Sequence, residues 1–404
     1  MKRHGRIAVV YPRGSLDSEP STNNTVVRLA EHGYEVDIYT PLSSNYVYPR
    51  FANQRVSITP VYVPHAGQKS RWRALVSEVA WLLRLRIWQA HLLSRHLRSP
   101  YVCAIGVDPH GLIAAQVITQ GLKIPLAYYS LELLLSYELV TKEQEELKAQ
   151  EAALSRQAAF VVTQDQKRAE LLIRDNGLDP CRVICVPNAP LGQPKRQRSD
   201  YLRQKLNIPA DKTVLLYPGA ILAWACLHQL MQSTHAWPED WVLVVHTQSK
   251  SGAVNQDYLE ALRYLLKPGS VVFSSEPVPR EEYTQLVQSA DVGVAFYQAV
   301  PGPGLTEDSR RYVGLASGKL AYFLQAGIPV IVNDNPSLGP LIRKYGCGEV
   351  ADDPSVTIGA IRRVLANYEA CSLNALACFE KEFDFAGRFE QVLAAFEALE
   401  HRRR

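Results

Sequence analysis

The chain has 404 residues, of which 47% are hydrophobic and 21% are charged, and its formal net charge is +4 at pH 7. This composition is typical of a globular protein with two domains; it excludes a disordered chain and argues against a nucleic-acid-binding protein. No segment reaches the roughly 20 apolar residues of a membrane-spanning helix, and the seven cysteines include no CxxC pair. We therefore expect a cytoplasmic protein with reduced thiols.

The first half of the chain alternates between apolar runs and helical patterns. Residues 6–11 predict a buried parallel strand, a helical pattern ending at Gly33 follows, and residues 34–39 predict the next strand. This strand–helix–strand unit indicates a doubly wound α/β fold. Further strands are expected near residues 56–63, 102–107, 126–130, 160–163 and 183–186, with helices over residues 112–120 and 142–158.

A polar and charged stretch over residues 192–198 interrupts this pattern and predicts a linker between two domains. We assign residues 1–190 to a first Rossmann-like domain and residues 191–382 to a second, with a final helix within residues 383–404 that packs back on the first. Because ligands of such folds bind at the carboxyl ends of the strands, the cleft between the two sheets is the expected site. The second domain has predicted strands at residues 213–217, 241–246, 271–274, 292–296 and 329–332.

Six short segments, in this order along the chain, carry a resemblance to a known family. They are residues 107–112 (VDPHGL), 124–133 (IPLAYYSLEL), 186–190 (VPNAP), 290–295 (ADVGVA), 317–320 (SGKL) and 324–332 (LQAGIPVIV). Together they resemble the GT-B glycosyltransferases of family 4. The resemblance implies a nucleotide-diphospho-sugar donor in the second domain, an acceptor in the first, retention of anomeric configuration, and no metal or other cofactor.

Ser317, Gly318 and Lys319 stand where a loop enters a predicted helix. Free backbone N–H groups and the positive end of the helix dipole can receive a diphosphate there, with Lys319 adding charge. The alternative is a plain helix with Ser317 as its N-cap. Gly219 follows the predicted strand at residues 213–217 and lets a ligand approach the backbone closely, although glycine in such a turn is often only a turn residue.

The chain departs from the family pattern at several donor-site positions. The resemblance expects two glutamates eight positions apart, where this chain has Gly314 and Tyr322. It also expects an arginine and a lysine shortly after the turn at Gly219, which residues 223–227 do not supply, and a histidine where Leu131 stands. Since negative charge develops on the leaving diphosphate, other cations must compensate if the protein is an enzyme. The expected donor-binding set is therefore Gly219, His246, Ser274, Val278, Arg310, Arg311, Ser317, Gly318, Lys319 and Tyr322.

Acidic residues near the cleft are the candidate catalytic groups. Glu307 and Asp308 follow a Pro/Gly-rich loop and offer carboxylates to sugar or ribose hydroxyls, and Glu132 lies in one of the family-like segments. A solvated charged loop is the alternative for Glu307 and Asp308. For the acceptor we expect Gly14, Asp108 and His110, which follow the predicted strands of the first domain.

Residues 70–98 form one long predicted helix with a basic face. Arg73, Arg84 and Arg95 are eleven residues apart, which is close to three helical turns, so they share that face. Such a face predicts adsorption to an anionic membrane and a lipid-linked acceptor, with a solvated outer face as the alternative. Trp81 and Trp88 border the basic face, and Trp72, Leu75, Val76, Val79, Leu83 and Leu97 form the opposite, core-seeking face.

Three functional hypotheses remain open on the sequence alone. The first is a glycosyltransferase with a nucleotide-sugar donor and a sugar, lipid-linked or small-molecule acceptor, cytoplasmic or peripheral at the inner membrane face. The second is a non-catalytic GT-B protein that binds nucleotide-sugar or a partner enzyme, and the third is an epimerase or phosphorylase. The sequence contains no GxGxxG motif after its first strand, which disfavours a dinucleotide-binding enzyme. It also contains no Walker, GxSxG or HExxH motif, the patterns typical of nucleoside triphosphatases, serine hydrolases and zinc proteases.

Overall fold

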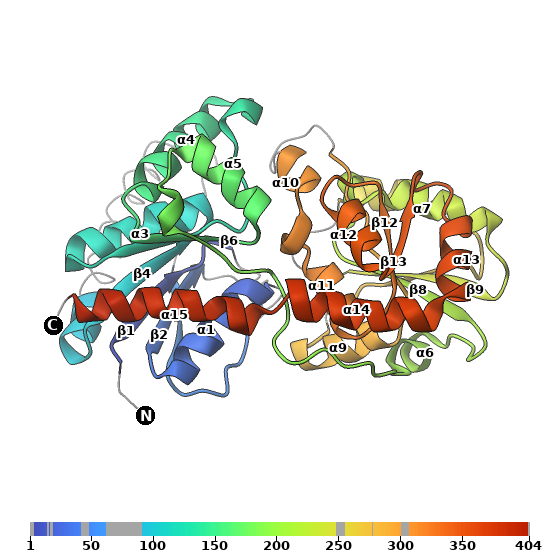
Figure 1. Ribbon diagram of the computed structural model, residues 1–404, viewed down its shortest axis with the longest axis horizontal. Helices are drawn as coiled ribbons and strands as arrows, with labels where there is room; N and C mark the ends of the chain where they lie inside the picture. The colour runs from blue at the N-terminus through green and yellow to red at the C-terminus, as the bar shows by residue number, and fades with distance from the viewer. Residues whose placement is uncertain are drawn as a thin grey trace, which may run out of the picture.

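The computed structural model describes residues 4–13, 16, 19–41, 48–61, 91–247, 255–276, 278–299 and 307–402. Two parallel β-sheets dominate it, one in each half of the chain, and helices cover both (Figure 1). This arrangement confirms the prediction of two Rossmann-like domains in a GT-B architecture. None of the described helices is both long and apolar enough to cross a membrane.

The first sheet has the strand order β3-β2-β1-β4-β5-β6-β7, and its neighbouring strands run parallel. The chain order reverses between β1 and β4, so the carboxyl ends of these two strands open a crevice. The apolar runs predicted these strands because parallel strands are buried on both faces. The bounds are Arg6–Val10 (β1), Glu35–Pro41 (β2), Val56–Val61 (β3), Tyr101–Val107 (β4), Leu126–Tyr129 (β5), Phe160–Thr163 (β6) and Val183–Cys185 (β7).

The second sheet has the order β10-β9-β8-β11-β12-β13 and reverses between β8 and β11. Sequence analysis missed β13, because it has four residues of which a single one is buried, too short a pattern for periodicity to detect. The bounds are Thr213–Pro218 (β8), Trp241–His246 (β9), Val271–Ser274 (β10), Val292–Val294 (β11), Val330–Asn333 (β12) and Gly348–Ala351 (β13).

The described helices connect these strands. Helix α3 begins earlier than predicted, at Asp108, because Pro109 suits the first helical turn and the helix starts directly at the end of β4. Those of the first domain are α1 (Pro20–His32), α3 (Asp108–Leu122), α4 (Lys142–Ser155) and α5 (Gln166–Asn176). Those that follow are α6 (Tyr201–Leu206), α7 (Leu227–Ser233), α8 (Gln256–Arg263), α9 (Arg280–Gln288), α10 (Glu307–Arg311), α11 (Gly318–Gln325), α12 (Leu338–Tyr345), α13 (Ile358–Ala366), α14 (Tyr368–Glu382) and α15 (Phe385–His401).

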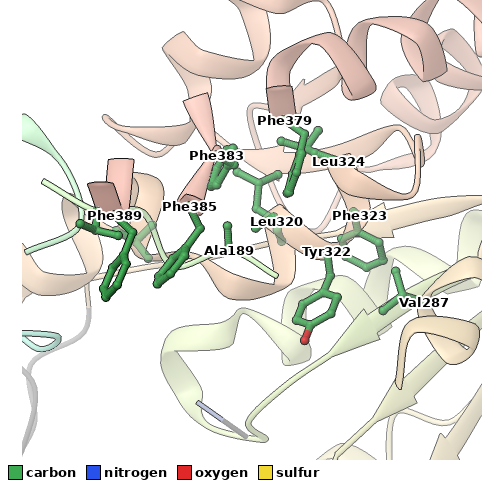
Figure 2. Packing of buried hydrophobic residues seen from close by; sticks show 14 of the residues in the cluster. Ala189, Val287, Leu320, Tyr322, Phe323, Leu324, Phe379, Phe383, Phe385 and Phe389 are labelled. Carbon is green, nitrogen blue, oxygen red and sulfur yellow. The ribbon is translucent and has the colours of Figure 1, made fainter. Parts of the chain in front are cut away.

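The last two helices, α14 and α15, run along both domains and connect them. In Figure 1, α14 runs along the second domain and α15 continues along the first, with Phe383 and Asp384 between them. Four phenylalanines from the two helices and the junction between them are buried at the crossing and pack near α11 (Figure 2). They are Phe379, Phe383, Phe385 and Phe389. Burying them on both sides of the junction fixes the direction of α15 across the molecule.

The prediction of a basic, membrane-facing helix over residues 70–98 is wrong for the part that the structure describes. Residues 62–90 lie outside the described part of the chain, whereas residues 91–98 are helical. Arg95 pairs with the buried carboxylate of Asp37 and donates to Ser57 Oγ at 2.9 Å, so it is not available to a membrane surface. Leu97 is 77% exposed, which makes its assignment to a core-facing side wrong.

Candidate functional site

The carboxyl ends of β8 and β11 meet at the point where the second sheet reverses its strand order. Gly219 follows β8 and Tyr297 lies three residues beyond β11. Doubly wound sheets bind their ligands at this reversal because the loops leaving the two strands diverge to opposite faces. The residues around Gly219 and Tyr297 are therefore the candidate ligand site of the second domain.

Lys319 occupies this place with its side-chain amine. The residue as a whole is partly exposed, but its Nζ atom is buried and has no hydrogen-bond partner among the described residues. It lies 4.0 Å from the ring centroid of Tyr217, 4.8 Å from that of Tyr297 and 5.7 Å from that of Trp224. Aromatic faces attract a cation but do not replace a hydrogen bond. Burial lowers the pKa of Lys319 to about 7, so a part of the molecules carries a neutral amine at neutral pH.

The local structure of α11 aims Lys319 toward β8. Ser317 caps the helix, since its Oγ accepts from Leu320 N at 3.3 Å and also contacts Tyr297 Oη at 2.8 Å. Gly219 makes room for the amine, because a Cβ at that position would lie 3.0 Å from Lys319 Nζ and 3.3 Å from Tyr217 Oη. Glycine here thus serves a close approach of side chain to backbone, as the sequence suggested for a ligand.

A second group of polar atoms lies at the ends of β9 and β10. His246 is buried, its Nδ1 is 3.0 Å from Ser274 Oγ, and its Nε2 has no partner in the part of the chain that the structure describes. Burial lowers the pKa of His246 to about 4, so this imidazole is neutral at pH 7. Thr247 Oγ1 is likewise buried and unpaired within the described ranges. Buried polar atoms without partners are uncommon in native proteins, and several at one sheet edge indicate a ligand.

Tyr322, which replaces an expected glutamate, has a structural setting of its own. Its ring packs edge-on against Tyr283, with 4.9 Å between centroids, and Tyr283 in turn lies 6.5 Å from His246. Tyr322 also lines a cavity of about 460 Å³ together with Gln325 of α11 and Gln288 of α9. No carboxylate is available at this position, so the ribose contact implied by the resemblance cannot be made by residue 322.

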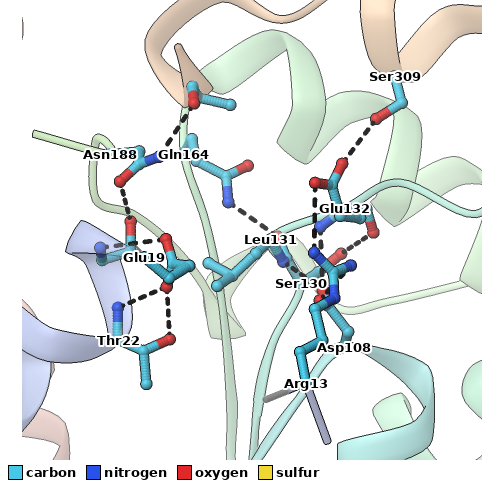
Figure 3. A network of polar contacts seen from close by, with 12 residues as sticks. Arg13, Glu19, Thr22, Asp108, Ser130, Leu131, Glu132, Gln164, Asn188 and Ser309 are labelled. Atoms are coloured by element: carbon cyan, nitrogen blue, oxygen red, sulfur yellow. Dashed lines mark hydrogen bonds and ion pairs between the residues drawn. The ribbon is translucent and has the colours of Figure 1, made fainter. Parts of the chain in front are cut away.

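The first domain contributes an acidic and basic cluster on its side of the cleft (Figure 3). Arg13 pairs with Asp108 at 2.8 Å and with Glu132 at 3.5 Å. Asp108 Oδ1 accepts from the backbone N–H groups of Leu131 and Glu132 at 3.0 and 2.9 Å, which fixes the loop after β5. Asp108 therefore orients Glu132, and Arg13 offsets part of the negative charge of the two carboxylates.

Glu132 is the point at which the two halves of the site meet. Its Oε2 lies 3.4 Å from Ser309 Oγ on α10 of the second domain. Burial and then the negative charge of Glu132 raise the pKa of Tyr297, against the opposing hydrogen bond with Ser317. The same carboxylate opposes the lowering of the Arg310 pKa that burial causes. One carboxylate of the first domain thus faces the aromatic and cationic groups of the second.

Buried contacts hold the two domains together beside the cleft. Arg168 is 1% exposed and donates to three carbonyl oxygens: Leu131 O at 2.8 Å in the first domain, and Ser309 O at 3.2 Å and Tyr312 O at 3.3 Å in the second. Tyr137 Oη donates to Asp308 Oδ2 at 2.5 Å, also across the domains. These bonds to charged groups are the strong class of protein hydrogen bonds.

The predicted catalytic carboxylates differ in availability. Asp308 is buried, accepts from Tyr137 and pairs with Arg311 at 3.0 Å, so its oxygens are already used. Glu307 is partly exposed at the start of α10. Glu132 is the predicted catalytic residue of the first domain, where it pairs with Arg13, and its carboxylate reaches Ser309 of the second domain.

The remaining predicted residues are distributed unevenly around the cleft. Val278 is buried after β10, Gly318 begins α11, and Arg310 is buried on α10. His110 is exposed on the first turn of α3. Gly14 lies outside the described residues, so its predicted role in acceptor binding stays a prediction.

Sequence reasoning missed four residues that the structure places at the site. Trp224 and Tyr297 stack with 5.6 Å between centroids and cover Lys319. Tyr297 could have been identified from the sequence, because it lies just beyond a strand end at the reversal of the strand order. Arg13 and Arg168 gave no comparable signal, since their partners come from distant segments.

Comparisons with known proteins bear on the family of the first domain and on the fold. Residues 18–189 match the model of the glycosyl transferase 4-like domain. Sucrose-phosphate synthase from Thermosynechococcus elongatus has a similar structure, with a TM-score of 0.71 at 16% identity, over 98% of this chain and 99% of that one. HepE from Anabaena in complex with UDP-glucose gives 0.70 at 14% identity, over 98% and 100% of the chains.

A third similar structure is WaaG, a glycosyltransferase involved in lipopolysaccharide biosynthesis, with a TM-score of 0.63 at 18% identity over 96% of this chain and 98% of that one. No curated protein sequence gives a significant match. The family match supports the glycosyltransferase resemblance over residues 18–189, and the structural likeness confirms the GT-B fold.

Proposed function

We propose that this chain, whose first domain is a glycosyl transferase 4-like domain, transfers a sugar from a nucleotide-diphospho-sugar to an acceptor in the cleft between its domains. The observation that carries the proposal is Lys319, a buried amine without a hydrogen-bond partner in the described residues, at the strand-order reversal of the second sheet. Its position supports a diphosphate held between the Gly219 turn and the start of α11.

Lys319 takes the place of the arginine and lysine that the family resemblance implies after the turn at Gly219 and that this chain lacks. The cation reaches that turn from α11 instead, with Nζ 3.0 Å from the place of a Cβ on Gly219. As the bond between sugar and diphosphate breaks, negative charge grows on the diphosphate, and a buried cation stabilises that charge more than a solvated one. His246 Nε2 and Thr247 Oγ1 are further polar atoms that a phosphate or ribose oxygen can contact.

Glu132 is the residue that we assign to the acceptor. Its carboxylate accepts a hydrogen bond from the reacting hydroxyl of the acceptor, while Asp108 and Arg13 keep the loop and the charge in place. We further propose retention of configuration without a metal ion, as the family resemblance implies. The acceptor is a sugar or a lipid-linked sugar, a class that the likeness to WaaG supports.

A non-catalytic nucleotide-sugar-binding protein is the second candidate. Tyr322 in place of the expected glutamate, and the oxygens of Asp308 engaged by Tyr137 and Arg311, favour it. Such a protein would retain the Lys319 site and would leave the donor intact.

Release of nucleoside diphosphate from UDP-, GDP-, ADP- and dTDP-sugars, with soluble and lipid-linked sugar acceptors, separates these two functions. We expect turnover with one donor class, and Glu132→Gln should lower kcat at least about 100-fold, the range for loss of a group that accepts a proton or hydrogen bond in the transition state. Glu143→Gln, on the exposed start of α4, is the matched control and should keep full activity. Donor binding without release in any combination would favour the non-catalytic function.

A further inference from the structure

A cluster of histidine and glutamate side chains lies at the opposite end of the first sheet from the cleft. His4 precedes β1, His32 ends α1 just before β2, and Glu397 and Glu400 lie on α15. Since β1 and β2 are parallel, residues before them lie at the amino ends of the strands, away from the carboxyl ends that form the donor and acceptor sites. The proposed function does not use this cluster.

The geometry of the cluster suits a metal ion. One ligand atom each from His4, His32 and Glu397 lie within 4.8 Å of one another. The two imidazole rings are 5.1 Å apart between centroids, and His32 Nε2 lies 2.8 Å from Glu397 Oε1. A tetrahedral zinc ion with bonds of about 2.0–2.2 Å needs ligand atoms roughly 3.3–3.5 Å apart, so small side-chain rotations suffice to admit one.

Glu400 has the position of a supporting carboxylate. Its Oε2 contacts His4 Nδ1 at 2.8 Å, and the side chains of His4 and Glu400 are only 10% and 14% exposed. Histidines that bind metals usually donate their other ring N–H to a carboxylate, which fixes the tautomer and the ring orientation. Glu400 therefore orients His4 and leaves the second nitrogen of that ring for the ion.

Tyr34 supplies an independent sign that the site lacks a component. The residue is fully buried, and its hydroxyl has no hydrogen-bond partner among the described residues. Its ring lies 4.6 Å from that of His4 and 6.0 Å from that of His32.

We propose that His4, His32 and Glu397 bind a divalent transition-metal ion, with Glu400 orienting His4. Two imidazoles and one carboxylate are a ligand set that zinc accepts, with a fourth position left for water. The ion joins three segments: the residue before β1, the end of α1 and the C-terminal helix. Because α15 is also the helix that crosses from the second domain, the ion fixes the path of that crossing and has no part in sugar transfer.

Calorimetric titration of the full-length, chelator-treated chain with Zn²⁺ tests the proposal. We expect one ion per chain and a higher midpoint of thermal unfolding with Zn²⁺ present. His32→Gln and Glu397→Gln should each abolish this binding, and Glu400→Gln should weaken it about 10–100-fold, as loss of a supporting carboxylate does. His235→Gln, an exposed histidine of the second domain, is the control and should leave the affinity unchanged.

Two results would overturn the proposal: no saturable binding by the intact chain, or the same affinity and stoichiometry in a folded His4→Gln/His32→Gln double variant. Should that double variant fail to fold, Glu397→Gln decides the matter, because its side chain is 44% exposed and its loss leaves no buried charge. Unchanged Zn²⁺ affinity in folded Glu397→Gln would count against the site.

Discussion

Lys319→Met should make the protein more stable and at the same time a poorer binder of nucleotide-diphospho-sugars. Methionine fills the space between Tyr217, Trp224 and Tyr297 without placing an amine in an apolar environment. The pKa of Lys319 falls from 10.5 to about 7 on folding, so removing the amine should raise the free energy of unfolding at pH 7 by roughly 1–4 kcal/mol. Donor affinity should fall about 10–100-fold, as for loss of a charged hydrogen bond.

The gain in stability should depend on pH in a defined direction. Between pH 7 and pH 10.5 the unfolded chain holds a proton on Lys319 that the folded chain lacks, so the stability of the wild-type protein rises with pH through this window. The advantage of Lys319→Met should therefore shrink as the pH approaches 10.5, as urea unfolding at several pH values can measure. Lys381→Met, on the exposed side of α14, is the control and should change neither stability nor affinity by a measurable amount.

Arg168→Met is expected to loosen the contact between the domains. The substitution removes the donor to Leu131 O, Ser309 O and Tyr312 O and leaves these carbonyls without that partner. Each buried carbonyl oxygen that loses its donor costs about 1–3 kcal/mol of stability. We expect a larger radius of gyration in small-angle scattering, faster proteolysis between the domains and a lower kcat, while each domain keeps its secondary structure.

Arg174→Met provides the comparison for this prediction, because Arg174 is on the same helix α5 but exposed. It should leave scattering, proteolysis and turnover as they are in the wild-type protein. Wild-type scattering from folded Arg168→Met would mean that the other contacts between the domains, among them the Tyr137–Asp308 bond and the aromatic crossing of α14 and α15, suffice to hold the domains in place.

The fold could be predicted from the sequence because parallel strands are continuous apolar runs. The predicted ranges 241–246 and 271–274 coincide with β9 and β10, since both are bounded by polar or turn residues. Helix starts were less visible: α3 begins at Asp108, where the proline at position 109 was the available signal. Strand β13 is too short for its pattern to separate it from a loop.

The site could be predicted only in part, because its residues come together through topology. Lys319 was found from a loop-to-helix pattern, yet its aromatic neighbours belong to segments separated by tens of residues. Asp308 was expected to face the sugar, and the structure instead uses it between Tyr137 and Arg311. The order of strands and loops in the sequence predicts which residues lie near strand ends. It does not predict which of those side chains are already engaged by residues of the other domain.

Proton uptake on donor binding tests most directly whether Lys319 receives the diphosphate. The intact diphosphate of a nucleotide-sugar does not titrate near pH 8, and neither does His246, whose pKa is about 4. Calorimetry with UDP-glucose and the other nucleotide-sugars, at pH 8 in two buffers of different ionisation enthalpy, therefore measures the protonation of the lysine. We predict uptake of close to one proton per donor bound to the wild-type protein and none in Lys319→Met, because the bound anion raises the pKa of an amine that is mostly neutral at pH 8. Binding to the wild-type protein with no proton uptake, or with equal affinity in Lys319→Met, would contradict the account.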